Sequence, residues 1–552
     1  MLGTLLFCLT IQPALTKIAQ GLQDTSLIAI VDDINIAGPV DQVSVALGRI
    51  LKEFPGLGLS LSPAKSALLW PTHTPTPQSL QTLSASHDIP IHAGSLPLLG
   101  SIVGSDTKAA MTFASSKAEA HSPFFHALTH ESMPLQNAYL LLRSSAVPRL
   151  NFLCRTLPPH ITLDACQIFQ AHVLKTALHL LQLPQQSLSQ VALRQIQLPL
   201  RLGGLGLRSV VDTAPAAYLG SLAASAPLIA PICFPPPAPI LIILQQSLDH
   251  FNQCDDLKLP TPQHFFAHFA NPSPATHLPP HKLQQHLSFA LAQSDHHLLY
   301  KSLTQPLQAH LTSLSQKGAS LWLTTTHRPE FVLRNQEFLF ALRLRLLLPP
   351  SSNFPSHCFC GSPLQSPDHF LICSRLRRRA VTQRHDSIAF FLRNFLRQAG
   401  APAEIEPRLM DNSRTRPDLS YTLPRDFTQA LFLLDVSIVH PTAPSLLPLA
   451  LRPLAASHLR ARQKTLKYQA LAQKENATFI PFIIESTGAF WRTVPQTLLQ
   501  IADHCCTGDF GGLSPREVKR YLSRAIAILL QRGNANILRQ GLSYSSATAR
   551  RV

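Results

Sequence analysis

The chain has 552 residues, of which 45% are hydrophobic and 14% are charged. That length accommodates several domains with cores of their own, and the composition excludes a wholly disordered chain. The formal net charge of +17 favours a polyanionic partner, with nucleic acid ahead of an anionic membrane. Ten cysteines scattered over this length do not indicate a disulfide scaffold.

The N-terminal stretch MLGTLLFCLTIQPAL is apolar, but it lacks the positive region and the small-residue cleavage site of a signal peptide. We therefore expect a helix with a buried face there. A second apolar stretch, residues 227–244, contains six prolines, which would break a membrane helix. We interpret it as an interdomain linker, and we predict no membrane span and an intracellular location, in the nucleus or cytoplasm.

Residues 1–105 have a mixed α and β pattern. After the apolar helix, SLIAIVDDINIAG (26–38) predicts a β-hairpin with Asp32 and Asp33 at or near its turn. A helix is expected over 41–53, followed by short strands in LSLSPAKSALLWP and SLPLLGSIVG. Residues 106–230 have helical apolar periodicity, and residues 231–338, rich in Pro, His and Gln, predict a linker with weak helices.

Residues 339–380 contain an apolar helix or strand, a Cys/His cluster and a basic run. Residues 381–510 predict an amphipathic helix closed by Gly400, and then strand, strand, helix and strand, which is an α/β pattern. Basic helices follow over 511–552, with Ser514 as N-cap and Glu517 three residues later. The predicted fold class is multidomain, combining α/β and α+β parts.

Four pieces of the first region occur in a recognisable order: LGTLLFCLTIQPAL, VDDINIAG, SPAKSALLWP and LLGSIVG. This set resembles the palm of reverse transcriptases from non-LTR retrotransposons, and LPLRLGGLGLRSVVDTAPAAYLGSL (198–222) also resembles retroelement reading frames. The resemblance implies a partial polymerase palm over 1–105 and a helical thumb over 106–230. It also implies Asp32 as the stronger catalytic Mg²⁺ ligand, Asp33 as a supporting acid and Lys65 as a nucleic-acid contact. The alternative is that the two aspartates only serve the turn.

That family also requires a catalytic aspartate on an earlier strand. This chain begins at the Gly-rich turn that follows the strand. We therefore expect that this polypeptide alone does not polymerise DNA.

The stretch CFCGSPLQSPDHFLIC gathers Cys358, Cys360, His369 and Cys373 within 16 residues. Three thiolates and one imidazole suit a structural, tetrahedral Zn²⁺ site, and Gly361 permits the tight turn of a zinc knuckle. The alternative is three free thiols and a core histidine. A basic run follows, with Arg375, Arg377, Arg378, Arg379 and Arg384. These arginines are predicted either to contact phosphates or to form a solvated basic face.

Asp418 and Asp435 are separated by sixteen residues, which suits two neighbouring strands with an acid at a shared site. Two carboxylates can hold Mg²⁺, and a nearby lysine can orient water and steady a phosphate. An aspartate inside the apolar strand FLLDVSIV needs a partner. In the alternative reading these are surface charges of an α/β domain.

Residues 355–505 resemble the restriction-like endonuclease of site-specific non-LTR retrotransposons, a relative of the PD-(D/E)xK nucleases. In that family a Cys/His knuckle precedes the nuclease, and the catalytic lysine lies on a helix. The resemblance implies Asp418 and Asp435 as metal ligands and Lys464 or Lys467 as the catalytic lysine. Glu406 is a further candidate acid, and RHD (384–386) and Glu485 fall where the family has such pieces.

These patterns leave three hypotheses. The first is a Mg²⁺-dependent DNA endonuclease, with structural Zn²⁺, from a retrotransposon protein that acts on element RNA and target DNA. The second is a protein that binds RNA or DNA without catalysis. The third is a decayed element.

Overall fold

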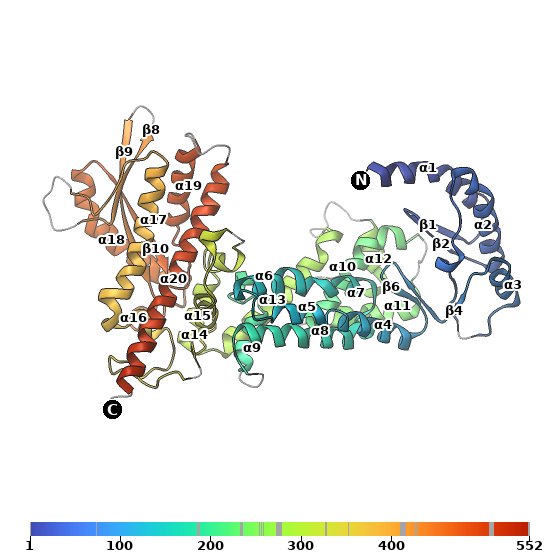
Figure 1. Cartoon of the computed structure of the whole chain (residues 1–552), viewed down its shortest axis with the longest axis horizontal. Coiled ribbons are helices and arrows are strands. Elements are labelled where there is room, and N and C mark those ends of the chain that lie inside the picture. Colours follow the sequence, from blue (N-terminus) through green and yellow to red (C-terminus); the bar gives the residue numbers. More distant parts are fainter. Residues whose placement is uncertain are drawn as a thin grey trace. The chain divides into compact units, whose positions relative to one another are not determined.

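The computed structural model describes residues 2–549 except 73, 185–187, 232–235, 253, 255–256, 258, 272–278, 326–327, 352, 409–415, 426–427 and 507–512. The chain divides into two compact units. The first runs to Lys117 and includes His160–Ala165, and the second comprises Ala118–Pro159 and Cys166–Val552. Figure 1 labels the helices and strands where there is room.

The first unit opens with helix α1 (Leu2–Ala19), hairpin β1 (Ser26–Ile30) and β2 (Asp33–Ala37), and helix α2 (Val40–Glu53). Apolar side chains of α1 and α2, among them Ile18 and Ile50, bury themselves in one core beneath the hairpin. The pairing Ile30↔Asp33 leaves a two-residue turn, in which Val31 has a left-handed φ of 59°. The predicted helices and hairpin are confirmed.

Helix α1 is the one described helix that is long and apolar enough to cross a membrane, as judged by length and composition alone. Core helices of globular proteins and signal sequences meet the same criterion. Four of its residues, Ile11, Ala14, Leu15 and Ile18, are buried.

Short elements complete the first unit: β3 (Leu68–Trp70), α3 (Gln78–His87), β4 (Ile91–Ala93), β5 (Ser95–Leu98) and β6 (Ser101–Gly104). Strands β3 and β4 pair in parallel, and β5 and β6 form a hairpin. The strands predicted around 68–70 and 95–104 are present. Helix α3 and strand β4 were not predicted, because their sequence has only a few apolar residues at regular spacing.

The predicted helical region over 106–230 is confirmed. It contains α4 (Thr107–Glu119), α5 (Ser122–Leu128), α6 (Leu135–Leu141), α7 (Asn151–Thr156), α8 (Pro159–Leu180), α9 (Gln190–Gln197) and α10 (Val210–Ile229).

The Pro-rich segment 227–244 does not separate two domains, so the interdomain-linker prediction is wrong. Helices α10, α11 (Ala238–Asp249), α12 (Phe265–Ala270) and α13 (Leu283–Ser302) share one core, which includes Leu219 and Leu244. Pro237 is the N-cap of α11, and a further proline occupies its first turn, where proline is tolerated. Pro237 and Pro239 therefore mark the start of a helix, whereas Pro227 lies inside α10, and residues 232–235 lie outside the described residues.

The Gly-rich segment LPLRLGGLG, which follows α9, is held by a buried arginine. Arg345 lies near the end of α15 (Asn335–Arg345) and is 3% exposed. Its guanidinium donates to the carbonyls of Gly204 at 3.1 Å and Ala319 at 3.0 Å. A side chain at Gly204 would lie 2.0 Å from the Leu198 carbonyl oxygen, so only glycine allows this close approach.

A four-stranded sheet organises the C-terminal part, in the order β10 (Thr478–Glu485), β9 (Thr428–Val439), β8 (Leu419–Arg425), β7 (Ala403–Ile405). Strand β10 is parallel to β9, and the other neighbours are antiparallel. Helices α17 (Thr382–Gln398), α19 (Thr493–Cys506) and α20 (Pro515–Ala549) pack on one face. Helix α18 (Ala455–Lys474) packs on the other. The predicted order of strand, strand, helix and strand is confirmed.

Helix α20 continues for 35 residues and passes through two glycines. A Cβ at Gly533 would lie 2.4 Å from Cγ of Arg384, and one at Gly541 would lie 2.4 Å from the Phe370 ring. The glycines therefore let α20 pack closely against the start of α17 and against the cysteine-rich segment. Figure 1 shows α20 running beside α17 and α15. The glutamate half of the predicted capping box is present, since the Ser514 amide and hydroxyl both donate to Glu517, at 2.8 and 2.7 Å.

Candidate metal and carboxylate sites

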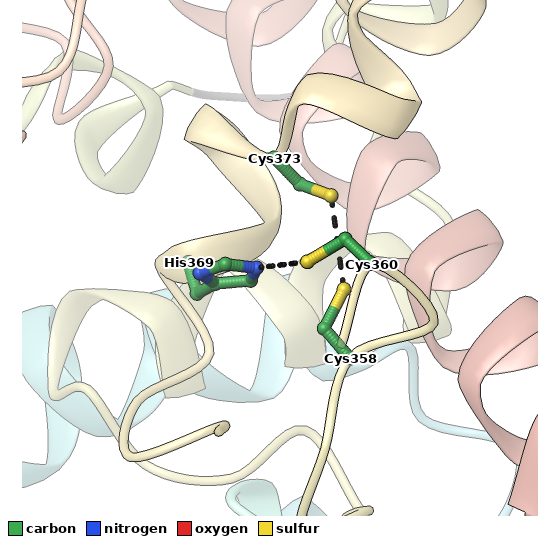
Figure 2. Close-up of side chains that lie close together, drawn as sticks. All are labelled: Cys358, Cys360, His369 and Cys373. Carbon is green, nitrogen blue, oxygen red and sulfur yellow. Dashed lines mark hydrogen bonds between the residues drawn. The ribbon is translucent and has the colours of Figure 1, made fainter. Parts of the chain in front are cut away.

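The four predicted zinc ligands lie together. Cys358 and Cys360 come from a tight loop in which Gly361 has a φ of 91°. His369 is the first residue of the short helix α16 (His369–Ile372), and Cys373 follows its last residue. One ligand atom from each residue lies within 4.8 Å of all the others. The Cys358 and Cys373 sulfurs are 3.7 Å apart, and the Cys360 sulfur is 3.4 Å from Nε2 of His369 (Figure 2).

These separations fit zinc. Two sulfurs, each about 2.3 Å from one tetrahedral ion, lie about 3.8 Å apart. Burial opposes the Cys360 thiolate, but hydrogen bonds with Ser362, Cys358 and His369 outweigh burial and lower the Cys360 pKa to about 6. The geometry and chemistry of the cluster could therefore hold Zn²⁺.

The cysteine cluster is built into the surrounding fold. Cys358 and Cys373 are both 3% exposed and share a core with Phe370, α15 and the second half of α20. The Phe359 amide donates to the Ser545 hydroxyl on α20 at 3.1 Å. The cysteine cluster therefore packs against the second half of α20 and stabilises its position.

The basic run divides into exposed and buried arginines. Arg375, Arg377 and Arg379 are exposed, whereas the side chain of Arg378 lies outside the described residues. Arg384 is 3% exposed and donates to Asn534 Oδ1 at 2.7 Å, and burial lowers its pKa to about 10. Arg384 is therefore not part of the exposed basic face, because its guanidinium lies inside the fold beside α20.

Asp418 and Asp435 come together across two strands. The pair Leu419↔Leu434 places Asp418, which immediately precedes β8, beside Asp435 in the middle of β9. Asp435 is 1% exposed, and its Oδ2 lies 2.7 Å from Nζ of Lys464 on α18. Asp418 accepts a hydrogen bond from the Val436 amide at 2.7 Å.

The two candidate lysines differ in position. Lys464 contacts Asp435, whereas Lys467 is exposed and contacts Tyr468, with Nζ 3.3 Å from the hydroxyl and 4.7 Å from the ring centre. The Tyr468 hydroxyl donates to the Arg416 carbonyl at 2.8 Å. Burial, followed by Asp435, raises the Tyr468 pKa.

His385 is a member of this cluster that sequence reasoning left without a role. Its Nε2 is 3.0 Å from both Asp418 Oδ2 and the Val436 carbonyl oxygen, and its Nδ1 is 3.0 Å from Asp386. Burial disfavours its charge, but hydrogen bonds and charge from Asp418 and Asp386 raise the pKa of His385 to about 9. The RHD triplet was the available signal.

The other two acids differ from this pair. Glu406 is exposed, and its amide donates to the Asp418 carbonyl at 3.1 Å. Glu485 is 2% exposed and accepts hydrogen bonds from the Ser313 and Ser457 hydroxyls. Glu485 therefore lies in an internal pocket lined by hydroxyl groups. Burial there raises the Glu485 pKa.

In the first unit, Asp32 and Asp33 are exposed at the tip of the β1–β2 hairpin, and Lys65 is exposed at the end of a 3₁₀ turn. Within the described residues, no third acid, histidine or cysteine joins the two aspartates in a group able to share a metal ion.

No protein-family model matches the chain. A curated protein that it resembles is the retrotransposable element SLACS 132 kDa protein of Trypanosoma brucei gambiense, at 22% identity over 572 aligned positions. The alignment covers all of this chain and 40% of that protein, so the chain spans less than half of its relative's length. The chain is retrotransposon-related. This agrees with the retroelement resemblance at the coarse level.

Proposed function

We propose that the C-terminal part of this retrotransposon-related chain is a Mg²⁺-dependent DNA endonuclease that nicks target DNA. The observation that carries the proposal is the meeting of Asp418, Asp435 and Lys464. Two carboxylates from adjacent strands and one lysine from the covering helix form the donor set that hydrolytic phosphoryl chemistry uses.

The residues fit a Mg²⁺ ion by their chemistry. Mg²⁺ prefers hard oxygen ligands, and the site offers two carboxylates and the Val436 carbonyl. Asp418 Oδ2 and the Val436 carbonyl oxygen both face Nε2 of His385 at 3.0 Å, so the two oxygens lie close together. When bound, the ion would supply Lewis-acid stabilisation of the phosphate and activation of water.

The protein groups have separable roles in this proposal. Lys464 supplies positive charge beside the buried Asp435 and donates toward the attacking water or a phosphate oxygen. His385 fixes the orientation of Asp418, and Tyr468 anchors α18 to the Arg416 carbonyl in front of β8. Lys464, rather than Lys467, is therefore our candidate for the catalytic lysine.

A supercoiled-plasmid nicking assay with Mg²⁺ tests the proposal. Asp435→Ala and Lys464→Met should abolish nicking, whereas Lys467→Met, its neighbour on the same helix, should retain it. Nicking that survives Asp435→Ala, or that depends equally on both lysines, would refute this assignment of the site.

A second candidate function is nucleic-acid binding without catalysis. The observation in its favour is that the residue Asp435 is 1% exposed and its carboxylate is already paired with Lys464, so a metal must compete with that ion pair. Zinc-loaded, folded protein that binds DNA but fails to nick in Mg²⁺ would support this alternative.

For the first unit we keep the proposal that residues 1–105 derive from a polymerase palm, with Asp32 and Asp33 at its hairpin. Support comes from the hairpin register and the relationship to a retrotransposable element protein. Because no third ligand joins the pair in the described residues, we assign no polymerisation step to it.

A further inference from the structure

Helices α15, α17 and α20 enclose a groove that is separate from both sites above. Its cavity measures about 400 Å³, within the usual range of roughly 300–1,000 Å³ for ligand pockets. Four arginines line it: Arg334, Arg384, Arg532 and Arg539. The acidic side chain in the lining is Glu337, which pairs with Arg334 at 2.5 Å.

The buried member of this set lacks a compensating charge. Arg384 forms no ion pair with any carboxylate in the described part of the chain, and its Nε has no hydrogen-bond partner there. A buried cation without a partner is costly, so an anion in the groove would relieve that cost. Arg384 therefore favours a negatively charged ligand.

Two of the other arginines, Arg532 and Arg539, indicate the length of that ligand. Nη2 of Arg532 donates to the Glu330 and Val332 carbonyls at 3.1 and 2.8 Å, which fixes its guanidinium at the groove and leaves its other donors for a ligand. Arg532 and Arg539 are seven residues apart on α20, which corresponds to about 10 Å along the helix axis. Arg539 is exposed, and one of its Nη atoms donates to Asn536 Oδ1 at 3.0 Å, so most of its donors face the groove or solvent. Gln383 of α17 and Asn536 of α20 hydrogen-bond to each other at 3.3 Å and add neutral polar groups to the wall.

We propose that this groove binds the sugar-phosphate backbone of a single nucleic-acid strand. A strand carries one negative charge per nucleotide and can meet two arginines about 10 Å apart, whereas one inorganic phosphate cannot. The lining has charged and amide side chains but, among the described residues, no exposed aromatic side chain on which a base could stack. We therefore expect the groove to contact the phosphates of the strand rather than its bases. The inference takes only the class of polyanion from the proposed function.

The test uses the full chain with Asp435→Ala, so that no substrate is cut, and a fluorescent 20-nucleotide single-stranded DNA followed by anisotropy without Mg²⁺. Arg539→Gln should make the fall of log affinity with log salt less steep by about 0.7, and it should raise the Kd about fivefold at 0.1 M salt. Gln383→Glu, which adds a negative charge to the wall, should also weaken binding. The matched control is Arg520→Gln, an exposed position on the same helix outside the groove, and it should leave the slope unchanged.

Equal losses in Arg539→Gln and Arg520→Gln would overturn the groove, because they would mean diffuse attraction to a basic surface. A duplex or millimolar inorganic phosphate that competes as well as the single strand would overturn the strand assignment. Plasmid nicking by the chain with Asp435 intact is scored separately. Absence of nicking with Arg539-dependent binding rejects the endonuclease and keeps the groove, and nicking without that dependence does the reverse.

Discussion

Replacing Lys464 by methionine should loosen β9, because Asp435 would then be a buried carboxylate without its cation. The Asp435 side chain is 2% exposed and that of Lys464 is 17% exposed. Removing one partner of a buried ion pair costs about 3–5 kcal/mol, and the partial exposure of Lys464 places the expected cost near 3 kcal/mol. That corresponds to local opening that is over 100-fold more frequent.

Amide hydrogen exchange of the 428–439 peptide measures this opening directly. We expect faster exchange in Lys464→Met and little change in Lys467→Met, whose lysine contacts Tyr468 at the surface. Asp435→Asn should cost less, since Lys464 can turn toward solvent, and Asp435→Asn/Lys464→Met should recover most of the protection. Equal exchange in the two lysine variants, or a double variant as loose as Lys464→Met, would refute the ion-pair argument.

Three further predictions concern other parts of the chain. Purified protein should contain about one zinc per chain, Cys358→Ser should lose it, and exchange of the α20 peptide 535–545 should then rise, since that segment packs on the cluster; retained zinc would contradict the ligand set. Gly541→Ala should destabilise the protein by about 1–3 kcal/mol despite the better helix propensity of alanine, because the new methyl group meets the buried Phe370 ring. Gly48→Ala on α2, where nothing lies close to the new methyl group, should stabilise the protein by about 0.5–1 kcal/mol. Thermal or denaturant unfolding measures both changes. Burial lowers the pKa of His310 from 6.5 to about 4, so the unfolded chain binds the proton at a higher pH than the folded chain does. The free energy of unfolding should therefore fall by roughly 3 kcal/mol as the pH drops from 6.5 to 4. His310→Gln should remove that part of the pH dependence, and an unchanged profile would refute the argument.

Local patterns were enough to predict several elements. The alternating apolar residues around Asp32 and Asp33 predicted the hairpin, and strand, strand, helix and strand followed from the apolar runs between residues 417 and 485. Cys358, Cys360, His369 and Cys373 were found from spacing alone, because all four come from one short segment.

Features that depend on distant segments were not predictable in this way. The choice between Lys464 and Lys467 depends on which face of α18 meets β9, and the role of His385 depends on where α17 crosses the sheet. Arg384 looked like a surface charge because the glycine that accommodates it, Gly533, is 149 positions later. The same close packing explains why α20 continues through glycines that normally weaken a helix.

Strand β10 has a consequence for the protein before it finishes folding. It forms one border of the four-stranded sheet, and Pro481 sits in the middle of it, opposite Asp435. The 489–491 segment already pairs with the end of this strand, where the Glu485 amide donates to the Ala489 carbonyl at 2.8 Å. Along the rest of an edge strand, amide groups can pair with the same strand of another molecule, and proline removes one of those donors. We therefore expect Pro481 to reduce self-association of this edge strand, which is rich in Phe and Ile, during synthesis. The strand stays paired with β9, which carries Asp435 of the carboxylate site.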